Sequence, residues 1–91
     1  MTTRYARHPD LRLTVLGDEG VVLHLGTRRY YTVSDSGVTI LEALATPCTM
    51  DEVVARLTSE FDVTPDHAVS AARAFLEQGR RAGLVTVEET P

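Results

Sequence analysis

The sequence predicts a small α+β domain of winged-helix-turn-helix-like type, in which a three-stranded antiparallel sheet is followed by three helices. Two observations support this prediction. Apolar residues alternate with polar residues in the first third of the chain, which is the two-residue period of half-buried strands. From Ser34 the apolar residues follow the helical period of three to four residues, and they keep that period to Arg81. The strands therefore come first and the helices afterwards.

Three short strands are predicted in the alternating part of the chain. They cover Leu11–Val15, Val21–Leu25 and Arg29–Val33. Turn residues separate them, with Gly17–Gly20 after the first strand and Gly26–Arg28 after the second. Because the connections are short, the strands should form an antiparallel meander in which the first and third strands are both edges.

The first helix is predicted directly after the third strand. Ser34 or Asp35 can cap its N-terminus. Ile40, Leu41 and Leu44 share one apolar face, and the proline three residues later ends the helix.

The other two helices begin with cap sequences. Thr49 and Glu52 match a capping box, in which each side chain bonds the other residue's backbone. Thr64 precedes a proline at the start of the longest helix, which should run over Pro65–Arg81 and end at Gly83.

The ends of the chain are predicted to be loose parts of a single domain that spans residues 1–91. Residues 1–10 are polar and contain Pro9, so no regular structure is expected there, and residues 88–91 should be frayed. Leu84–Val87 could form a short closing strand. Flexible segments are thus expected at 1–10 and 88–91.

Composition limits the classes of function. The net charge is −4, and all nine basic residues are arginines set against 13 acidic residues, so no overall attraction to nucleic acid is expected. A lone cysteine excludes an internal disulfide and is typical of a reducing compartment. No apolar run approaches the roughly 20 residues that span a bilayer, and no signal peptide is recognisable. A cytoplasmic protein without membrane contact is therefore expected.

Catalysis, cofactors and metals are not indicated. Cys48 lies beside a proline, and His8, His24 and His67 are spread over three different segments, so no nucleophile–base pair is predicted. His24 lies between Leu23 and Leu25. Because successive strand residues point to opposite faces, His24 is predicted on the solvent face. Neither metal-ligand spacing nor a glycine-rich phosphate loop is present.

The third strand is the candidate binding element. An edge strand offers unpaired backbone groups to a partner peptide. Tyr30 and Tyr31 must point to opposite faces, and Arg28 and Arg29 stand at the strand entrance, where they could bind carboxylates. The alternative is an ordinary edge strand in which tyrosine reflects strand propensity and arginine prevents aggregation.

DNA binding is a second alternative, because winged helices often bind DNA. The third helix carries Arg73, Arg80 and Arg81, but Asp66 and Glu77 lie on the same helix. A phosphate-binding surface needs clustered cations, so this alternative is disfavoured. A small adaptor subunit with no peptide substrate also stays open.

The ordered motifs resemble those of PqqD-like proteins. The segment Val22–Ser34 resembles the family's strand signature, and Ile40–Leu44 corresponds to the apolar run of the helix that follows. Thr49–Val53 is similar to the opening of the family's second helix, and Gly83–Val85 to the end of its third. The resemblance covers roughly Leu11–Val87.

The resemblance implies a non-catalytic RiPP recognition element, which binds the leader peptides of ribosomally made natural products. The leader would add as an antiparallel strand to the third strand and lie against the third helix. The stand-alone protein of lasso-peptide pathways is the most similar member type, with a leader-removing cysteine protease and a cyclase as expected partners. A PqqD-type peptide chaperone for a radical-SAM enzyme is the alternative within the family.

Strand position and helical spacing together predict the peptide-binding residues. On the helix, residues spaced by three and four share one stripe, where Ala72 would leave room for a leader side chain and the arginines would bind leader acids. Ordinary core packing is the alternative for the apolar members of this stripe. The predicted residues are Arg28, Arg29, Tyr30, Tyr31, Thr32, Val33, Val69, Ala72, Arg73, Leu76 and Arg80.

Overall fold

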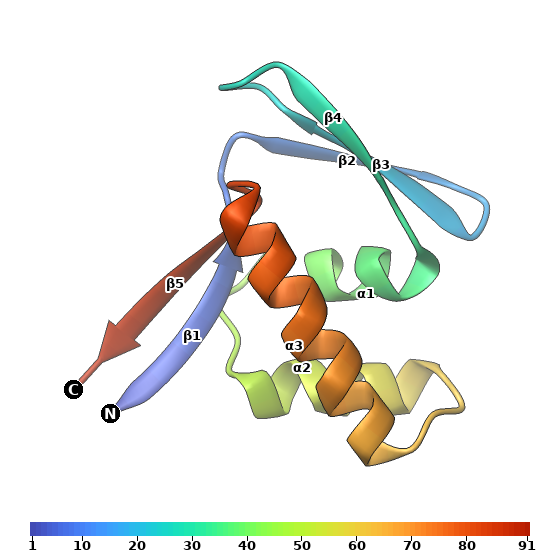
Figure 1. The fold of residues 1–91 in the computed structure, drawn as a ribbon, viewed down its shortest axis with the longest axis vertical. Helices are drawn as coiled ribbons and strands as arrows, with labels where there is room; N and C mark the ends of the chain where they lie inside the picture. The colour runs from blue at the N-terminus through green and yellow to red at the C-terminus, as the bar shows by residue number, and fades with distance from the viewer.

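The computed structural model describes residues 1–91 and contains two sheets and three helices (Figure 1). The three-stranded sheet consists of β2 (Leu11–Leu16), β3 (Glu19–His24) and β4 (Arg29–Val33). The helices are α1 (Asp35–Ala43), α2 (Met50–Glu60) and α3 (Pro65–Arg81). The remaining strands are β1 (Thr2–Arg7) and β5 (Val85–Thr90). The α+β prediction, with three antiparallel strands before three helices, is confirmed.

The three-stranded sheet is the predicted meander. β3 is central, and it pairs with β2 from Leu11↔His24 to Leu16↔Glu19. On its other side β3 pairs with β4 from Gly20↔Val33 to His24↔Arg29. β2 and β4 are therefore both edge strands, as expected.

A second, two-stranded sheet was not predicted. β1 and β5 pair antiparallel from Thr2↔Thr90 to Arg7↔Val85, and this ribbon projects from the body beside both chain ends (Figure 1). The interpretation of residues 1–10 as lacking regular structure is wrong for Thr2–Arg7, and the frayed end predicted after Val87 is strand up to Thr90. Neither segment shows a strong apolar alternation, because a projecting ribbon needs no deeply buried face.

The helix starts confirm the predicted caps. The Ser34 hydroxyl accepts a hydrogen bond from the N–H of Gly37, so Ser34 rather than Asp35 caps α1. Thr49 and Glu52 form the complete capping box of α2. The Thr64 hydroxyl caps α3.

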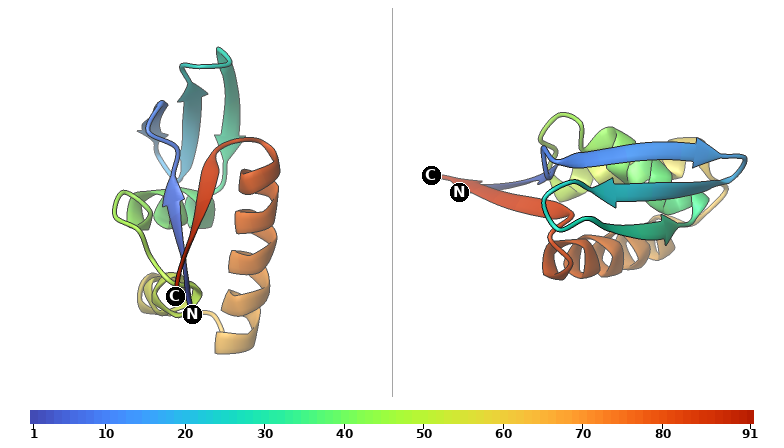
Figure 2. Two further views of the ribbon diagram at one scale, coloured as in Figure 1. Left: turned by 90° about the vertical axis from the view of Figure 1, so that its left-hand side faces the viewer. Right: turned by 90° about the horizontal axis from the view of Figure 1, so that it is seen from above.

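The core lies between the inner face of the three-stranded sheet and the helices. Figure 2 shows the sheet stacked over α1, with α2 below α1 and α3 along one side. Among the fully buried side chains are Val22 of β3, Ile40 and Leu41 of α1, and Val53 of α2. α3 contributes Leu76 and its neighbours to the same core.

The side-chain faces of β3 are opposite to those predicted. His24 is buried, with 6% of its surface exposed, whereas Leu23 and Leu25 are exposed. The His24 ring lies 4.6 Å from that of His8, and its Nδ1 accepts hydrogen bonds from the N–H groups of Gly26 and Thr27. These bonds satisfy Nδ1 of the buried imidazole. Because apolar residues occupy both faces of β3, alternation alone could not decide which face is inside.

Candidate functional site

The outer edge of β4 is open. β5 pairs with β1, so the C-terminal strand does not cover β4. Outside the β3–β4 ladder, no backbone–backbone hydrogen bond involves residues 29–33, and only the N–H of Arg29 has a side-chain partner, the Thr27 hydroxyl. Figure 2 shows α3 running alongside this edge in the view from above. Unpaired backbone groups therefore lie next to a helix surface.

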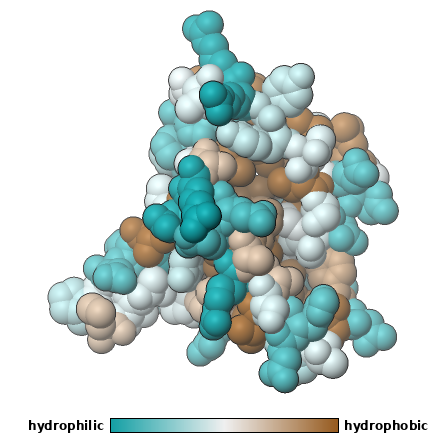
Figure 3. Space-filling model, in the orientation of Figure 1, coloured by the Kyte–Doolittle hydropathy of each residue, from teal (hydrophilic) through white to brown (hydrophobic).

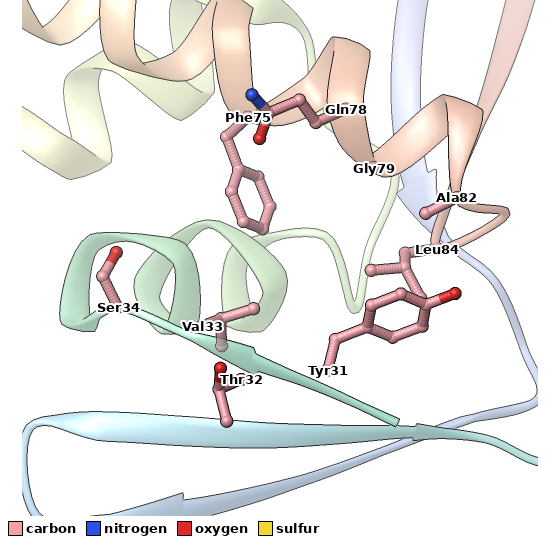
Figure 4. A pocket seen from close by; sticks show the side chains of 9 residues that line it. All are labelled: Tyr31, Thr32, Val33, Ser34, Phe75, Gln78, Gly79, Ala82 and Leu84. Atoms are coloured by element: carbon pink, nitrogen blue, oxygen red, sulfur yellow. The ribbon is translucent and has the colours of Figure 1, made fainter. Parts of the chain in front are cut away.

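A groove separates β4 from α3. We call it the β4 groove, and its volume is about 290 Å³. One wall comes from Tyr31–Ser34, and the other comes from the second half of α3 and the residues after it (Figure 4). The lining residues are Tyr31, Thr32, Val33, Ser34, Phe75, Gln78, Gly79, Ala82 and Leu84. In Figure 3 hydrophobic residues are visible in the recess between the sheet and the helices.

Strand alternation builds the first wall. Tyr31 and Val33 point inward and pack against the core, while Tyr30 and Thr32 point to the other face of the sheet. Tyr30 is 73% exposed. A strand added to β4 would therefore have one row of side chains beside Tyr31 and the other beside Tyr30.

Helical spacing builds the second wall. Phe75, Gln78, Gly79 and Ala82 follow the spacing of three and four residues that makes one stripe on α3. Phe75 points toward α1 at one end of the groove (Figure 4). At the other end, Gly79 and Ala82 have little or no side chain to fill the space, so the groove remains open.

The other edge of the sheet is less suited to a peptide. The depression beside β2 is lined by Arg7, Arg12 and Glu42 together with apolar residues of β2. No long helix runs beside it in Figure 2. An extended peptide there would have no second wall of the kind that α3 supplies to β4.

The strand residues of the predicted site lie where they were expected. Tyr31, Thr32 and Val33 line the β4 groove. Arg28 and Arg29 are exposed at the entrance of the strand, and neither forms an ion pair. Arg28 adopts a positive φ of 62°, which shapes the turn before β4.

The predicted site residues on α3 do not line the β4 groove with the strand residues. Ala72 and Leu76 are buried in the core, with 0% and 2% of their surfaces exposed, and Val69 is half-buried outside the groove. Arg73 and Arg80 line a different groove of about 690 Å³. This ribbon groove lies between α3 and the β1–β5 ribbon, where its other lining residues are Thr3, Tyr5, Met50, Leu76, Glu77, Val87 and Glu89. The prediction that these α3 residues face β4 is therefore wrong.

The prediction failed because α3 has two stripes of apolar or small residues. One stripe contains Ala68, Ala72 and Leu76 and packs in the core. The other includes Phe75 and Gln78 and faces β4. The glycine inside this long helix, Gly79, signals a close approach of the buried side of α3 to another element. A Cβ at Gly79 would lie 2.7 Å from Cγ2 of Val85, so the glycine is required where α3 packs on β5.

The charged groups of α3 are mostly engaged with each other. Glu77 forms ion pairs with Arg80 and Arg81 at 2.9 and 3.1 Å. The hydrogen bond from Arg80 and the charges of both arginines hold the pKa of Glu77 below its usual value. These exposed pairs engage two of the three arginines of α3, which a DNA-binding surface would need free.

Nothing in the fold activates Cys48. Its thiol donates to the carbonyl oxygens of Ala43 and Thr46, and burial raises the pKa of the Cys48 thiol. A protonated thiol is a poor nucleophile. No group of three or more His, Cys, Asp or Glu side chains is arranged to hold a metal ion. None of the helices has the length and apolar character needed to cross a bilayer.

The fold and its groove define a small α+β domain with one open strand edge flanked by a long helix. The family model for coenzyme PQQ synthesis protein D (PqqD) matches residues 19–85, so the chain belongs to the PqqD family. No curated protein matches the chain significantly.

Two solved structures share the fold. One is described as TbiB1 in complex with the TbiA(beta) leader peptide, with a TM-score of 0.77 and 24% identity over 88% of this chain and 93% of that chain. The other is described as lasso peptide synthetase B1 complexed with the leader peptide. Its TM-score is 0.74 at 20% identity, over 90% of this chain and 96% of that chain.

Proposed function

We propose that this protein binds the leader region of a ribosomally made precursor peptide as an added strand on β4. The observation that carries the proposal is the open edge of β4 lying along the β4 groove. Membership of the PqqD family supports it, as do the two structural neighbours, which are both described as leader-peptide complexes. The pathway favoured by those neighbours is lasso-peptide biosynthesis, and the expected location is the cytoplasm.

Strand addition divides binding into two contributions. Backbone hydrogen bonds along β4 supply affinity that depends little on peptide sequence. Every second side chain of the peptide enters the β4 groove, where Tyr31, Phe75 and Leu84 favour apolar side chains. The leader is disordered before it binds, so the cost of ordering it keeps the affinity modest for the contact area.

The biochemical role is presentation and not catalysis. With Cys48 bonded to backbone carbonyls, the chain offers no activated nucleophile, and it needs no cofactor for peptide binding. A leader-removing cysteine protease that docks on this protein would meet the bound precursor at high effective concentration. A cyclase would benefit in the same way.

Two alternative functions differ from this proposal, one in the partner enzyme and the other in the ligand. A PqqD-type peptide chaperone would use the same groove and differ in its partner, a radical-SAM enzyme. A winged-helix DNA-binding regulator would need a cationic α3, yet Arg80 and Arg81 are paired with Glu77. A gel shift with random duplex DNA at low salt should therefore show no binding.

Backbone methylation tests the proposal directly. Peptides would be selected on the immobilised protein from a random library long enough to pass along β4, and the tightest would be synthesised with single N-methylated amides. We expect affinity to fall at alternate positions only, because alternate N–H groups of an added strand bond to β4. Uniform tolerance of methylation along the peptide would exclude strand addition.

A further inference from the structure

A second cavity lies beside α3, one helical turn closer to its N-terminus than the β4 groove. We call it the Ala71 cavity, and its volume is about 210 Å³. The end of α2, the start of α3 and the start of α1 meet around it. Its lining residues are Asp35, Ser36, Leu57, Phe61, Val63, His67, Ala68 and Ala71. The interior is mainly apolar and the mouth is polar.

The Ala71 cavity continues the path of the β4 groove. Ser34 lines the β4 groove, and the next two residues, Asp35 and Ser36, line the Ala71 cavity. On α3, Ala71 of the cavity precedes Phe75 of the groove by four residues, which is a rise of about 6 Å. Phe75 therefore stands between two openings on one side of the helix. An extended chain covers that rise in about two residues.

The direction of an added strand determines which part of a peptide reaches the Ala71 cavity. A strand antiparallel to β4 starts beside Val33 and ends beside Arg29. Its N-terminal continuation therefore passes Ser34 toward Asp35 and Ser36. We propose that the Ala71 cavity binds an apolar side chain of the leader, a few residues N-terminal to the strand segment. This inference rests on the proposed function, because it takes the direction of the added strand from it.

Charge complementarity supports the same orientation. Asp35 lies at the mouth of the Ala71 cavity, and the exposed Asp62 and Asp66 are neighbours in sequence of its lining residues. No arginine lines this cavity. At the opposite end of β4, Arg28 and Arg29 are exposed and have no ion-pair partner. The preferred peptide thus carries cations on its N-terminal side and acids after the strand segment.

Three tryptophan variants separate the two cavities. Ala71→Trp fills the Ala71 cavity, and Gln78→Trp fills the β4 groove from an exposed position. Ala74→Trp is the matched control, since Ala74 is exposed on α3 and lines neither opening. Circular dichroism and urea unfolding establish that each variant is folded.

The probe is the tightest peptide selected on the wild-type protein from the random library, together with a shortened form that ends at the strand segment. For wild type, removing the N-terminal residues should lower affinity about tenfold, as expected for exposing one buried apolar side chain. Ala71→Trp should bind the full and shortened probes equally, at the level of the shortened one. Gln78→Trp should weaken binding of both, and Ala74→Trp should change neither.

The outcomes distinguish this inference from the proposed function. If Ala71→Trp binds the full probe as tightly as wild type while Gln78→Trp does not, the Ala71 cavity is not part of the site and the β4 groove is. If Gln78→Trp also binds both probes normally, the proposed function fails with it. Should Ala71→Trp not fold, the wild-type comparison decides: equal affinity for full and shortened probes overturns the inference, and a tenfold difference supports it.

Discussion

Gly37 of α1 and Phe75 of α3 are in direct contact, and the absence of a side chain at Gly37 makes that contact possible. A Cβ at Gly37 would lie 2.8 Å from Cε2 of Phe75. One edge of the phenyl ring therefore approaches α1 at the end of the β4 groove, where the side chain points toward that helix (Figure 4). The width of the groove at this end depends on where that ring is seated.

Gly37→Ala should reduce peptide binding more than it reduces stability. The added methyl group displaces the end of a movable ring, and the better helix propensity of alanine, about 0.5–1 kcal/mol, offsets part of the strain. The displaced ring narrows one of the two openings beside it, so affinity for a selected peptide should fall severalfold. Fluorescence anisotropy and urea unfolding measure the two effects.

The control for Gly37→Ala is Glu42→Ala, an exposed change on the same helix that leaves the Phe75 ring untouched. It should preserve affinity. Equal affinity of Gly37→Ala and wild type would mean that Phe75 can move without affecting the site.

Tyr31→Ala should weaken peptide binding more than Tyr30→Ala does. The Tyr31 ring lines the groove, and removing it should cost about tenfold in affinity, typical for one apolar contact of this size. Tyr30 lies on the other face of the sheet, where it can cover only the outward side chains of the peptide. Tyr31→Phe keeps the ring and should bind almost normally. A larger effect at Tyr30 than at Tyr31 would place the peptide on the outer face.

Leu76→Ala should destabilise the fold. Leu76 is buried in the core, with 2% of its surface exposed, and does not line the β4 groove. Removing a buried leucine costs about 2–5 kcal/mol. Gln78→Ala, two residues away and exposed, should change the free energy of unfolding by less than about 0.5 kcal/mol. Urea unfolding of both variants tests the assignment of the two faces of α3.

Charge reversal should affect Arg29 and Arg73 differently. Arg29 stands at the end of β4, so Arg29→Glu should weaken binding of peptides with acidic residues after the strand, and more strongly at low salt. Arg73 lines the ribbon groove, so Arg73→Glu should leave this binding unchanged. Fluorescence anisotropy at two salt concentrations measures the peptide affinity of both variants. If Arg73→Glu lost peptide binding, the ribbon groove would be part of the peptide-binding site.

The capping box of α2 should make stability depend on acid pH. The backbone N–H of Thr49 donates to the Glu52 carboxylate and lowers the pKa of Glu52 in the folded state. This contribution is present above about pH 4.3, the usual glutamate pKa, and is lost as the pH falls through the lower folded value. Glu52→Gln should remove this part of the pH dependence, measured by urea unfolding between neutral and acid pH.

Thr49→Ala is the companion variant, since it removes the hydroxyl that accepts from the N–H of Glu52. It should cost about 1 kcal/mol at neutral pH. An identical acid dependence in wild type and Glu52→Gln would show that other carboxylates dominate.

Local signals in the sequence determined the order of the elements, the meander and the helix starts. A cap such as Thr49 acts on backbone groups within three or four residues, and strand alternation is visible within five. The open edge of β4 followed from the meander. These features could be predicted because the interactions that create them are short in sequence.

Only the tertiary structure decided which faces meet. β1 and β5 are paired across almost the whole chain, with a side-chain contact between Thr3 and Glu89, and no local pattern reports such a pairing. β3 and α3 each carry apolar residues on two sides, so periodicity revealed the stripes but not which one is buried. Packing of the whole molecule turned His24 inward, put Leu76 in the core and left Phe75 beside β4, because burial depends on neighbours that are distant in sequence.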